Sequence, residues 1–160
     1  MTSTIEQEES QVGDLFDRVD AVVEVASDIE GDHPGQAETL VKVSRDALAH
    51  ASPVRVPIAA RLLLVSDKTV RAWANEGVLV TRRQRPRLLL DAERLYQVLH
   101  FVLELRARGQ NRDLLTSLWQ RLHDEALLDR EDLQDSLAQM RAGRTTPALT
   151  KEEEAAARGQ

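Results

Sequence analysis

Residues 59–79 of this 160-residue chain read AARLLLVSDKTVRAWANEGVL, and this stretch decides the fold. Ser66 is a favourable N-cap residue, and Asp67 beside it suits the positive end of a helix dipole. Gly77 is the residue type that commonly follows the end of a helix. The pattern predicts a short helix from residue 57 or 58 to about 63, a tight turn, and a second helix over about residues 67–76. This spacing is typical of a helix-turn-helix.

The second of these helices has an apolar side and a polar side. Val70 and Trp73 are three residues apart, so we expect Trp73 in the core rather than stacked on a base. The polar side carries the candidate DNA-contacting residues Lys68, Thr69, Arg71 and Asn75. Arginine can pair with guanine edges and asparagine with adenine, while lysine and threonine can reach phosphates. Double-stranded DNA is therefore the expected partner.

An arginine-rich hairpin is expected after the second helix. Residues 78–81 and 87–90 are predicted to form two short strands around the polar tip RRQRP. The hairpin carries four candidate DNA-contacting arginines, Arg82, Arg83, Arg85 and Arg87. They could be merely solvated, but four arginines in six residues are hard to explain without an anion, so we favour contact with phosphates or the minor groove.

The charge is unevenly distributed along the chain. The net charge is −6 overall, which by itself argues against a nucleic-acid binder. Residues 1–54 hold 3 basic and 12 acidic side chains, residues 55–112 hold 12 and 5, and residues 113–160 hold 6 and 10. The central segment, with a net charge of +7, is the part suited to DNA, whose phosphates attract arginine and lysine.

Several classes of protein are disfavoured by the composition. The chain has no cysteine, which excludes disulfides, thiolate metal sites and a cysteine nucleophile. The four histidines lie far apart without metal-ligand spacing, and no phosphate-binding glycine loop or G-x-S-x-G motif occurs. We therefore expect no enzyme, metal or cofactor. The apolar runs are far shorter than the roughly 20 residues of a membrane span, and we expect no signal peptide and a cytoplasmic protein.

The fold expected for the whole chain is mainly α, a winged helix-turn-helix with a short two-stranded hairpin and flanking helices. Five parts are expected: a disordered N-terminus at 1–10, an acidic helical hairpin at 11–52, the winged helix-turn-helix at 53–110, a C-terminal helical extension at 111–143, and a mobile tail at 144–160. The extension is predicted as two helices, the first over residues 112 to about 127. Asp129 and Asp132 resemble a capping box and are predicted to start the second, which ends near residue 143. The sequence leaves open whether the acidic hairpin packs on the central domain.

A helix predicted over residues 92–108 is apolar nearly all round. Such a helix is either central to its domain or shared with a partner. We expect a homodimer, because two-fold readers of DNA need one to set the spacing of half-sites. The candidate interface residues are Leu95, Leu99 and Val102.

The run A-A-x-L-x-x-V-S-x-x-T-V-x-x-W-x-x-x-G-x-L, followed by the arginine-rich hairpin, resembles the winged helix-turn-helix of MerR-type and excisionase-type regulators. The resemblance covers about residues 56–109. It implies a DNA-binding dimer with the second helix in the major groove, and assigns Lys68, Thr69 and Arg71 to that helix contact. Many members have glycine before the Val-Ser pair where this chain has Leu64, and leucine in a left-handed conformation is costly. We therefore expect either a looser turn here or a partly degenerate motif.

The acidic segments around the central domain resemble the layout of bacterial antitoxins, notably those paired with PIN-type RNases. This resemblance implies an autorepressing transcriptional regulator that also neutralises a toxin encoded by the adjacent gene. The alternative is a protein-interaction or adaptor module, in which the helix-turn-helix is only a scaffold and the acidic flanks bind a basic partner. Leu64 and the negative net charge motivate that alternative.

Overall fold

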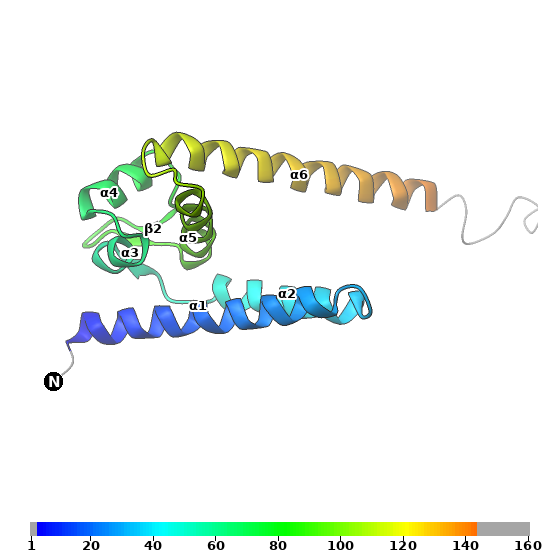
Figure 1. The fold of residues 1–160 in the computed structure, drawn as a ribbon, viewed down its shortest axis with the longest axis horizontal. Coiled ribbons are helices and arrows are strands. Elements are labelled where there is room, and N and C mark those ends of the chain that lie inside the picture. Colours follow the sequence, from blue (N-terminus) through cyan, green and yellow to red (C-terminus); the bar gives the residue numbers. More distant parts are fainter. Residues whose placement is uncertain (1–2, 144–160) are drawn as a thin grey trace, which may run out of the picture. The chain divides into compact units, whose positions relative to one another are not determined.

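The computed structural model describes residues 3–143 and divides the chain into two compact units, Met1–Leu118 and Trp119–Gln160. The first unit is mainly helical and contains a small antiparallel sheet (Figure 1). The expected tail at residues 144–160 lies outside the described residues. Among the described residues, no helix combines the length and the apolar character needed to cross a membrane.

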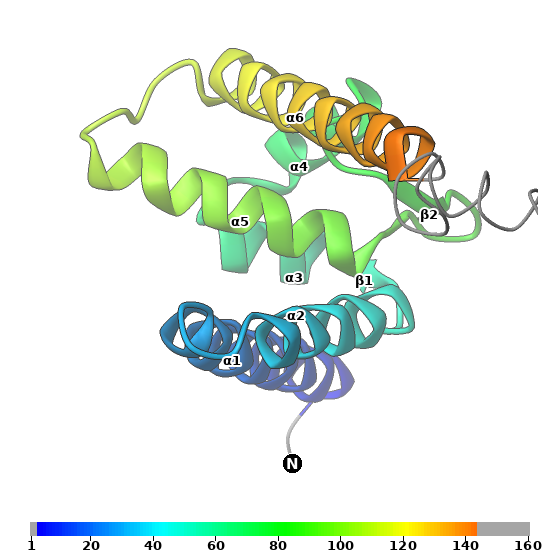
Figure 2. The same ribbon diagram turned by 90° about the vertical axis from the view of Figure 1, so that its right-hand side faces the viewer.

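The acidic hairpin consists of α1 (Thr4–Ile29) and α2 (Pro34–Ala49), which lie side by side in Figures 1 and 2. The expectation of disorder over residues 1–10 is wrong from Thr4 onward. The reason is a capping box: the Ser3 hydroxyl accepts from the Glu6 backbone N–H at 3.2 Å, and the Glu6 carboxylate accepts from the Ser3 N–H at 2.9 Å. The polar first turns of α1 are thereby helical without burying much apolar surface.

The hairpin packs on the central part of the first unit. Asp20 Oδ1 accepts a hydrogen bond from the Tyr96 hydroxyl at 2.6 Å and lies 2.9 Å from His100 Nε2. The Phe16 ring meets the edge of Tyr96 with ring centroids 5.3 Å apart. An ion pair joins Arg55 to Glu8 at 2.9 Å. The hairpin is therefore part of the same compact unit as the helices that follow it.

The helices α3 (Val56–Leu63) and α4 (Asp67–Asn75) confirm the two short helices predicted around the decisive stretch. Ala59 and Leu63 of α3 and Val70 of α4 are fully buried. The turn between the helices contains Leu64 in the left-handed region, with φ 55° and ψ 46°. The expectation of a looser turn is thus corrected, because the leucine adopts the conformation that glycine would adopt more easily.

The sheet has three strands, β1 (Val54–Arg55), β2 (Thr81–Arg83) and β3 (Leu89–Leu90), in the order β1-β3-β2. Only two strands were expected. The extended segment before α3 pairs with the free edge of β3, in the register Val54 with Leu90. Val78 and Leu79 are not in a strand but buried after α4, and their N–H groups donate to the Trp73 carbonyl.

The helix α5 (Ala92–Ala107) lies within the first unit and contacts α2 and α3 (Figure 2). Leu95, Val98 and Val102 are completely buried there. The expected dimer interface is therefore corrected at Leu95 and Val102, whose side chains fill the core of this chain. Leu99 is half-buried. The apolar surround of α5 thus reflects a central position within the domain.

The last helix, α6 (Leu114–Gly143), is continuous where two helices were predicted. Asp129 and Asp132 were interpreted as the start of a new helix, but neither glycine nor proline interrupts the chain there. Aspartate is tolerated in the interior of a helix at a modest propensity cost. Most of α6 belongs to the second unit.

Candidate nucleic-acid interface

The outer face of α4 presents three of the four predicted DNA-contacting side chains to solvent. Lys68, Arg71 and Asn75 are exposed, whereas Val70 is fully buried and Trp73 is 4% exposed. The prediction that Trp73 is a core residue is confirmed. The 3.6-residue period of the helix separates an apolar side from a polar side. Because the apolar side is fixed in the core, the polar side faces solvent.

Thr69 lies at the beginning of α4 and is half-buried. Its backbone N–H donates to the Ser66 hydroxyl at 3.1 Å, and the two side-chain hydroxyls are 2.9 Å apart. Thr69 therefore belongs to the cap of the helix. A phosphate contact through its hydroxyl would compete with this hydrogen bond.

The four hairpin arginines are all exposed, but they differ in their partners. Arg82 Nε donates to Asp91 Oδ1 at 2.7 Å, and the other carboxylate oxygen of Asp91 caps α5 by accepting from the Arg94 N–H. Arg83 Nε donates to the carbonyl oxygen of Arg85 at 2.8 Å. Arg82 thus ties the hairpin to the start of α5, while Arg83 stiffens the hairpin tip.

A hollow of about 410 Å³ brings α4 and the β2–β3 hairpin together. Arg71 of α4 lines it together with Gln84 and Arg87 of the hairpin. Arg55, the last residue of β1, lines it as well, although the sequence did not single out Arg55 or Gln84. Arg55 could have been found from its place in the proline-bracketed segment PVRVP, next to the first helix of the motif.

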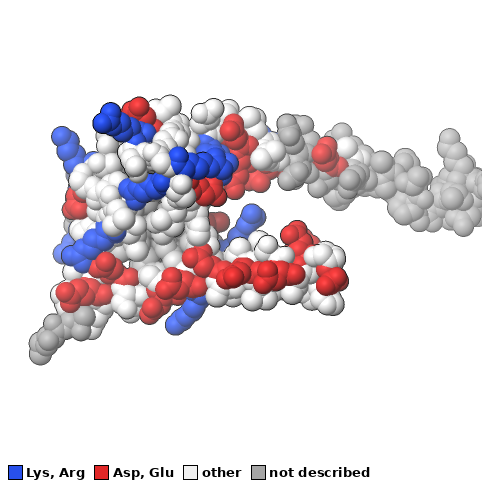
Figure 3. Space-filling model, in the orientation of Figure 1, with Lys and Arg blue, Asp and Glu red and all other residues white. Residues whose placement is uncertain are grey.

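The cations of this region fall into two groups. Within residues 3–143, Arg55, Arg61 and Arg82 each form an ion pair with a carboxylate. No such pair occurs, among the described residues, for a second group that we call the uncompensated cations: Lys68, Arg71, Arg83, Arg85 and Arg87. Figure 3 shows lysine and arginine gathered around α3, α4 and the sheet, while aspartate and glutamate follow α1 and α2. The uncompensated cations are thus free to meet an external anion.

Arg106 supports the turn that positions α4. Its Nη2 donates to the carbonyl oxygen of Leu64 at 3.2 Å, from α5 across to the end of α3. Its Nη1 is buried and finds no hydrogen-bond partner among the described residues. The sequence did not indicate this contact, because 42 residues separate the two partners.

The described residues contain no group of three or more histidine, cysteine, aspartate or glutamate side chains that could hold a metal ion. The exposed polar groups on α4 and the β2–β3 hairpin are instead mainly arginine, lysine and amide side chains. Such groups bind anions and base edges through charge-assisted hydrogen bonds.

The chain was compared with known protein families, with curated proteins and with solved structures, and no match was found in any of the three.

Proposed function

We propose that the chain is a sequence-specific double-stranded DNA-binding transcriptional regulator whose α3, α4 and β2–β3 hairpin form a winged helix-turn-helix. In this proposal α4 enters the major groove and the hairpin contacts the flanking backbone. The observation that carries the proposal is the set of five uncompensated cations on α4 and the hairpin, in a chain whose net charge is −6. Concentrating cations on one face releases counterions from a duplex and offsets the negative total.

The geometry supports different roles for the cations. Arg71 and Asn75 lie one turn apart on the exposed side of α4, at the spacing that lets both reach base edges from one groove. Arg83, Arg85 and Arg87 extend from the hairpin, where they suit phosphates or a narrow minor groove. Arg82 has the lesser role in DNA binding, because Asp91 already neutralises it.

The proposed regulator acts as a homodimer. Leu99 is half-buried and Leu103, one turn further along α5, is 50% exposed. These two leucines are the contact that we propose for a second copy, in place of Leu95 and Val102. A two-fold contact through them would pair two α4 helices for two half-sites.

A quantitative DNA-binding assay tests the proposal. Fluorescence anisotropy with the duplex upstream of the coding region should show saturable binding that exceeds binding to a scrambled duplex. Arg71→Ala and Arg83→Ala should each weaken specific binding by about tenfold or more, as expected for losing a charge-assisted contact. Lys42→Ala is the matched control, because Lys42 is exposed on α2 and outside the interface. Equal binding to both duplexes, or equal effects of all three variants, would sink the proposal.

The acidic hairpin favours a second function, the binding of a partner toxin. DNA binding and toxin binding together make up the antitoxin hypothesis. The helices α1 and α2 expose many carboxylates, and among them Val25 and Val43 are 51% and 57% exposed. Such a surface suits a basic partner protein, and we propose the toxin from the adjacent gene as that partner. Co-purification of the tagged chain with the product of the neighbouring reading frame tests this. Loss of the complex in Val25→Lys, but not in Arg85→Gln on the β2–β3 hairpin, would support the acidic hairpin as the contact with the toxin. If the product of the neighbouring reading frame never co-purifies, the toxin-binding role is contradicted, and only the DNA-binding role of the proposal remains.

A further inference from the structure

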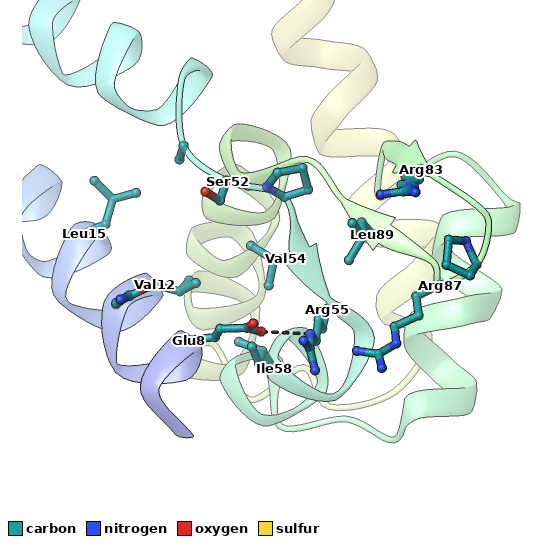
Figure 4. A pocket seen from close by; sticks show the side chains of 15 residues that line it. Glu8, Val12, Leu15, Ser52, Val54, Arg55, Ile58, Arg83, Arg87 and Leu89 are labelled. Atoms are coloured by element: carbon teal, nitrogen blue, oxygen red, sulfur yellow. Dashed lines mark ion pairs between the residues drawn. The ribbon is translucent and has the colours of Figure 1, made fainter. Parts of the chain in front are cut away.

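A second and larger hollow lies between α1, the segment before β1 and the β2–β3 hairpin (Figure 4). Its volume is about 700 Å³, within the roughly 300–1,000 Å³ of pockets that take small molecules. All of its walls belong to the first compact unit. It is separate from the outer face of α4, whose residues do not line it.

One side of this pocket is apolar. Val12 and Leu15 of α1 face it from one wall, and Val54, Ile58 and Leu89 from the strands and α3 on the other (Figure 4). Val54 and Ile58 are each 1% exposed, so they form a fixed base and have almost no accessible surface of their own. Val12, Leu15 and Leu89 are half-buried and provide the accessible apolar surface. A ligand that covered it would gain roughly 25 cal/mol for each Å² of apolar surface removed from water.

The rest of the lining carries an excess of positive charge. The charged residues that line the pocket are three arginines, Arg55, Arg83 and Arg87, and one glutamate, Glu8. Glu8 pairs with Arg55 at 2.9 Å, and Arg55 is held between α1 and β1 by this pair. Neither Arg83 nor Arg87 has a carboxylate partner among the described residues. Two guanidinium groups therefore remain to neutralise a ligand.

We propose that this pocket binds a small amphipathic anion, with its apolar body against Val12, Leu15 and Leu89 and its carboxylate, sulfonate or phosphate on Arg87 and Arg83. An apolar molecule without charge would leave the two arginines unsatisfied. An inorganic anion would leave the apolar wall wet. Only a ligand that combines the two chemistries satisfies the whole lining.

The same arginines connect the pocket to the proposed DNA interface, and this part of the inference rests on the proposed function. Arg55 and Arg87 line both hollows, and Arg83 and Arg87 belong to the uncompensated cations. An anion held by Arg83 and Arg87 removes them from the phosphate contacts. Ligand and duplex therefore bind competitively, and each lowers the apparent affinity for the other by the same factor.

The first test uses the full chain without DNA, and two dyes that differ only in charge. 8-Anilinonaphthalene-1-sulfonate is an aromatic anion, and N-phenyl-1-naphthylamine is the same skeleton without the sulfonate. We expect saturable binding of one equivalent of the sulfonate, with the neutral dye bound at least about tenfold more weakly. Arg87→Gln should reduce affinity for the sulfonate by about tenfold and leave the neutral dye unchanged. Arg85→Gln is the matched control, because Arg85 lies on the same hairpin but does not line the pocket.

Three results would overturn the pocket: equal affinity for the two dyes, several equivalents of bound sulfonate, or identical effects of Arg87→Gln and Arg85→Gln. Backbone amide shifts in a two-dimensional NMR titration locate the dye independently, and they should concentrate on α1 around Val12, on the segment before β1 and on the β2–β3 hairpin. A second arm adds the dye to the protein–duplex complex. If the dye binds and the affinity for the duplex is unchanged, the proposed competition alone is overturned. If the dye binds but the protein does not bind DNA, the proposed function is overturned and the proposed pocket is not.

Discussion

Arg106 Nη2 donates a hydrogen bond to the carbonyl oxygen of Leu64 at 3.2 Å, and this contact joins α5 to the one residue between α3 and α4 that has a positive φ. The backbone N–H of Leu64 is directed back to the end of α3. The turn is thus held on both sides of its strained residue. The orientation of α4 depends on this arrangement, because α4 begins only three residues later.

Replacing Leu64 with glycine should stabilise the protein. A left-handed residue with a side chain costs roughly 1–2 kcal/mol, and glycine avoids this cost at the expense of greater freedom in the unfolded chain. The Leu64 side chain is 75% exposed, so little apolar contact is lost. We expect Leu64→Gly to raise the free energy of unfolding by about 1 kcal/mol in a denaturant titration. Lys42→Gly is the control: Lys42 is exposed in the interior of α2 and outside the proposed contacts, and glycine there should destabilise by about 1 kcal/mol. If the two glycine variants change the free energy of unfolding in the same direction, the proposed strain at Leu64 is contradicted.

Tyr96 should titrate at unusually high pH. Burial raises the pKa of its hydroxyl, and the hydrogen bond to Asp20 and the charge of that carboxylate raise the pKa further. The neutral phenol is therefore the form that the fold favours, and its stabilising contribution is complete below the ordinary tyrosine pKa of about 10. That contribution is lost as the pH rises from about 10 toward the raised pKa.

The measurement is direct because Tyr96 is the single tyrosine of the chain, so phenolate absorbance reports this residue alone. We expect the titration midpoint above pH 10 in the folded protein and near about 10 in denaturant. Asp20→Asn should lower the folded midpoint, because it removes the negative charge. A folded midpoint at the ordinary value would show that Tyr96 is not held by Asp20.

The salt dependence of DNA binding should separate Lys68 from Arg82. A lysine that neutralises one phosphate contributes about 0.9 to the slope of log K against log salt. We therefore expect Lys68→Ala to reduce the magnitude of that slope by about one, and to weaken specific and non-specific duplexes alike. Arg82→Ala should change the slope by much less, because Asp91 already neutralises this side chain. If Arg82→Ala changes the slope more than Lys68→Ala does, then Arg82, and not Lys68, contacts a phosphate.

Asp91 should be more important for stability than an isolated surface ion pair. It caps α5 by accepting from the Arg94 N–H at 3.0 Å and also accepts from Arg82 at 2.7 Å. Asp91→Ala should lower the free energy of unfolding by about 1–2 kcal/mol through loss of the cap. Asp91→Asn retains an acceptor for the cap and should cost less. If the two variants are equally destabilised in thermal unfolding, the charge rather than the cap is what matters.

Dimerisation should depend on Leu103. A glutamate there leaves the core of α5 untouched but puts a charge in the proposed contact, so Leu103→Glu should be monomeric by light scattering while the wild type is dimeric. Val43→Glu, a similar change at an exposed apolar position of α2, should remain dimeric. A wild-type chain that is monomeric at all concentrations would contradict the dimer.

The elements that the sequence predicted well are those with local causes. The helices α3 and α4, the Ser66 cap and the burial of Trp73 follow from contacts within a few residues, and the structure agrees with all of them. The start of α1 also has a local cause, the capping box of Ser3 and Glu6, but the prediction of disorder for residues 1–10 rested on their polar composition alone. The continuous α6 was missed for a similar reason, because an acidic pair was interpreted as a cap.

What the sequence alone determined was therefore the order of the helices, the two sides of α4 and the concentration of positive charge in residues 55–112. Helical periodicity and capping act over three or four residues, so a linear pattern contains them. Only the tertiary structure decided that Arg82 pairs with Asp91, that Leu95 and Val102 fill the core, and that β1 completes the sheet. It also placed α1 on α3, which leaves between α1 and the β2–β3 hairpin the pocket lined by Arg83 and Arg87. These features join residues that are distant in the chain, and their partners are selected by packing, which no local pattern specifies.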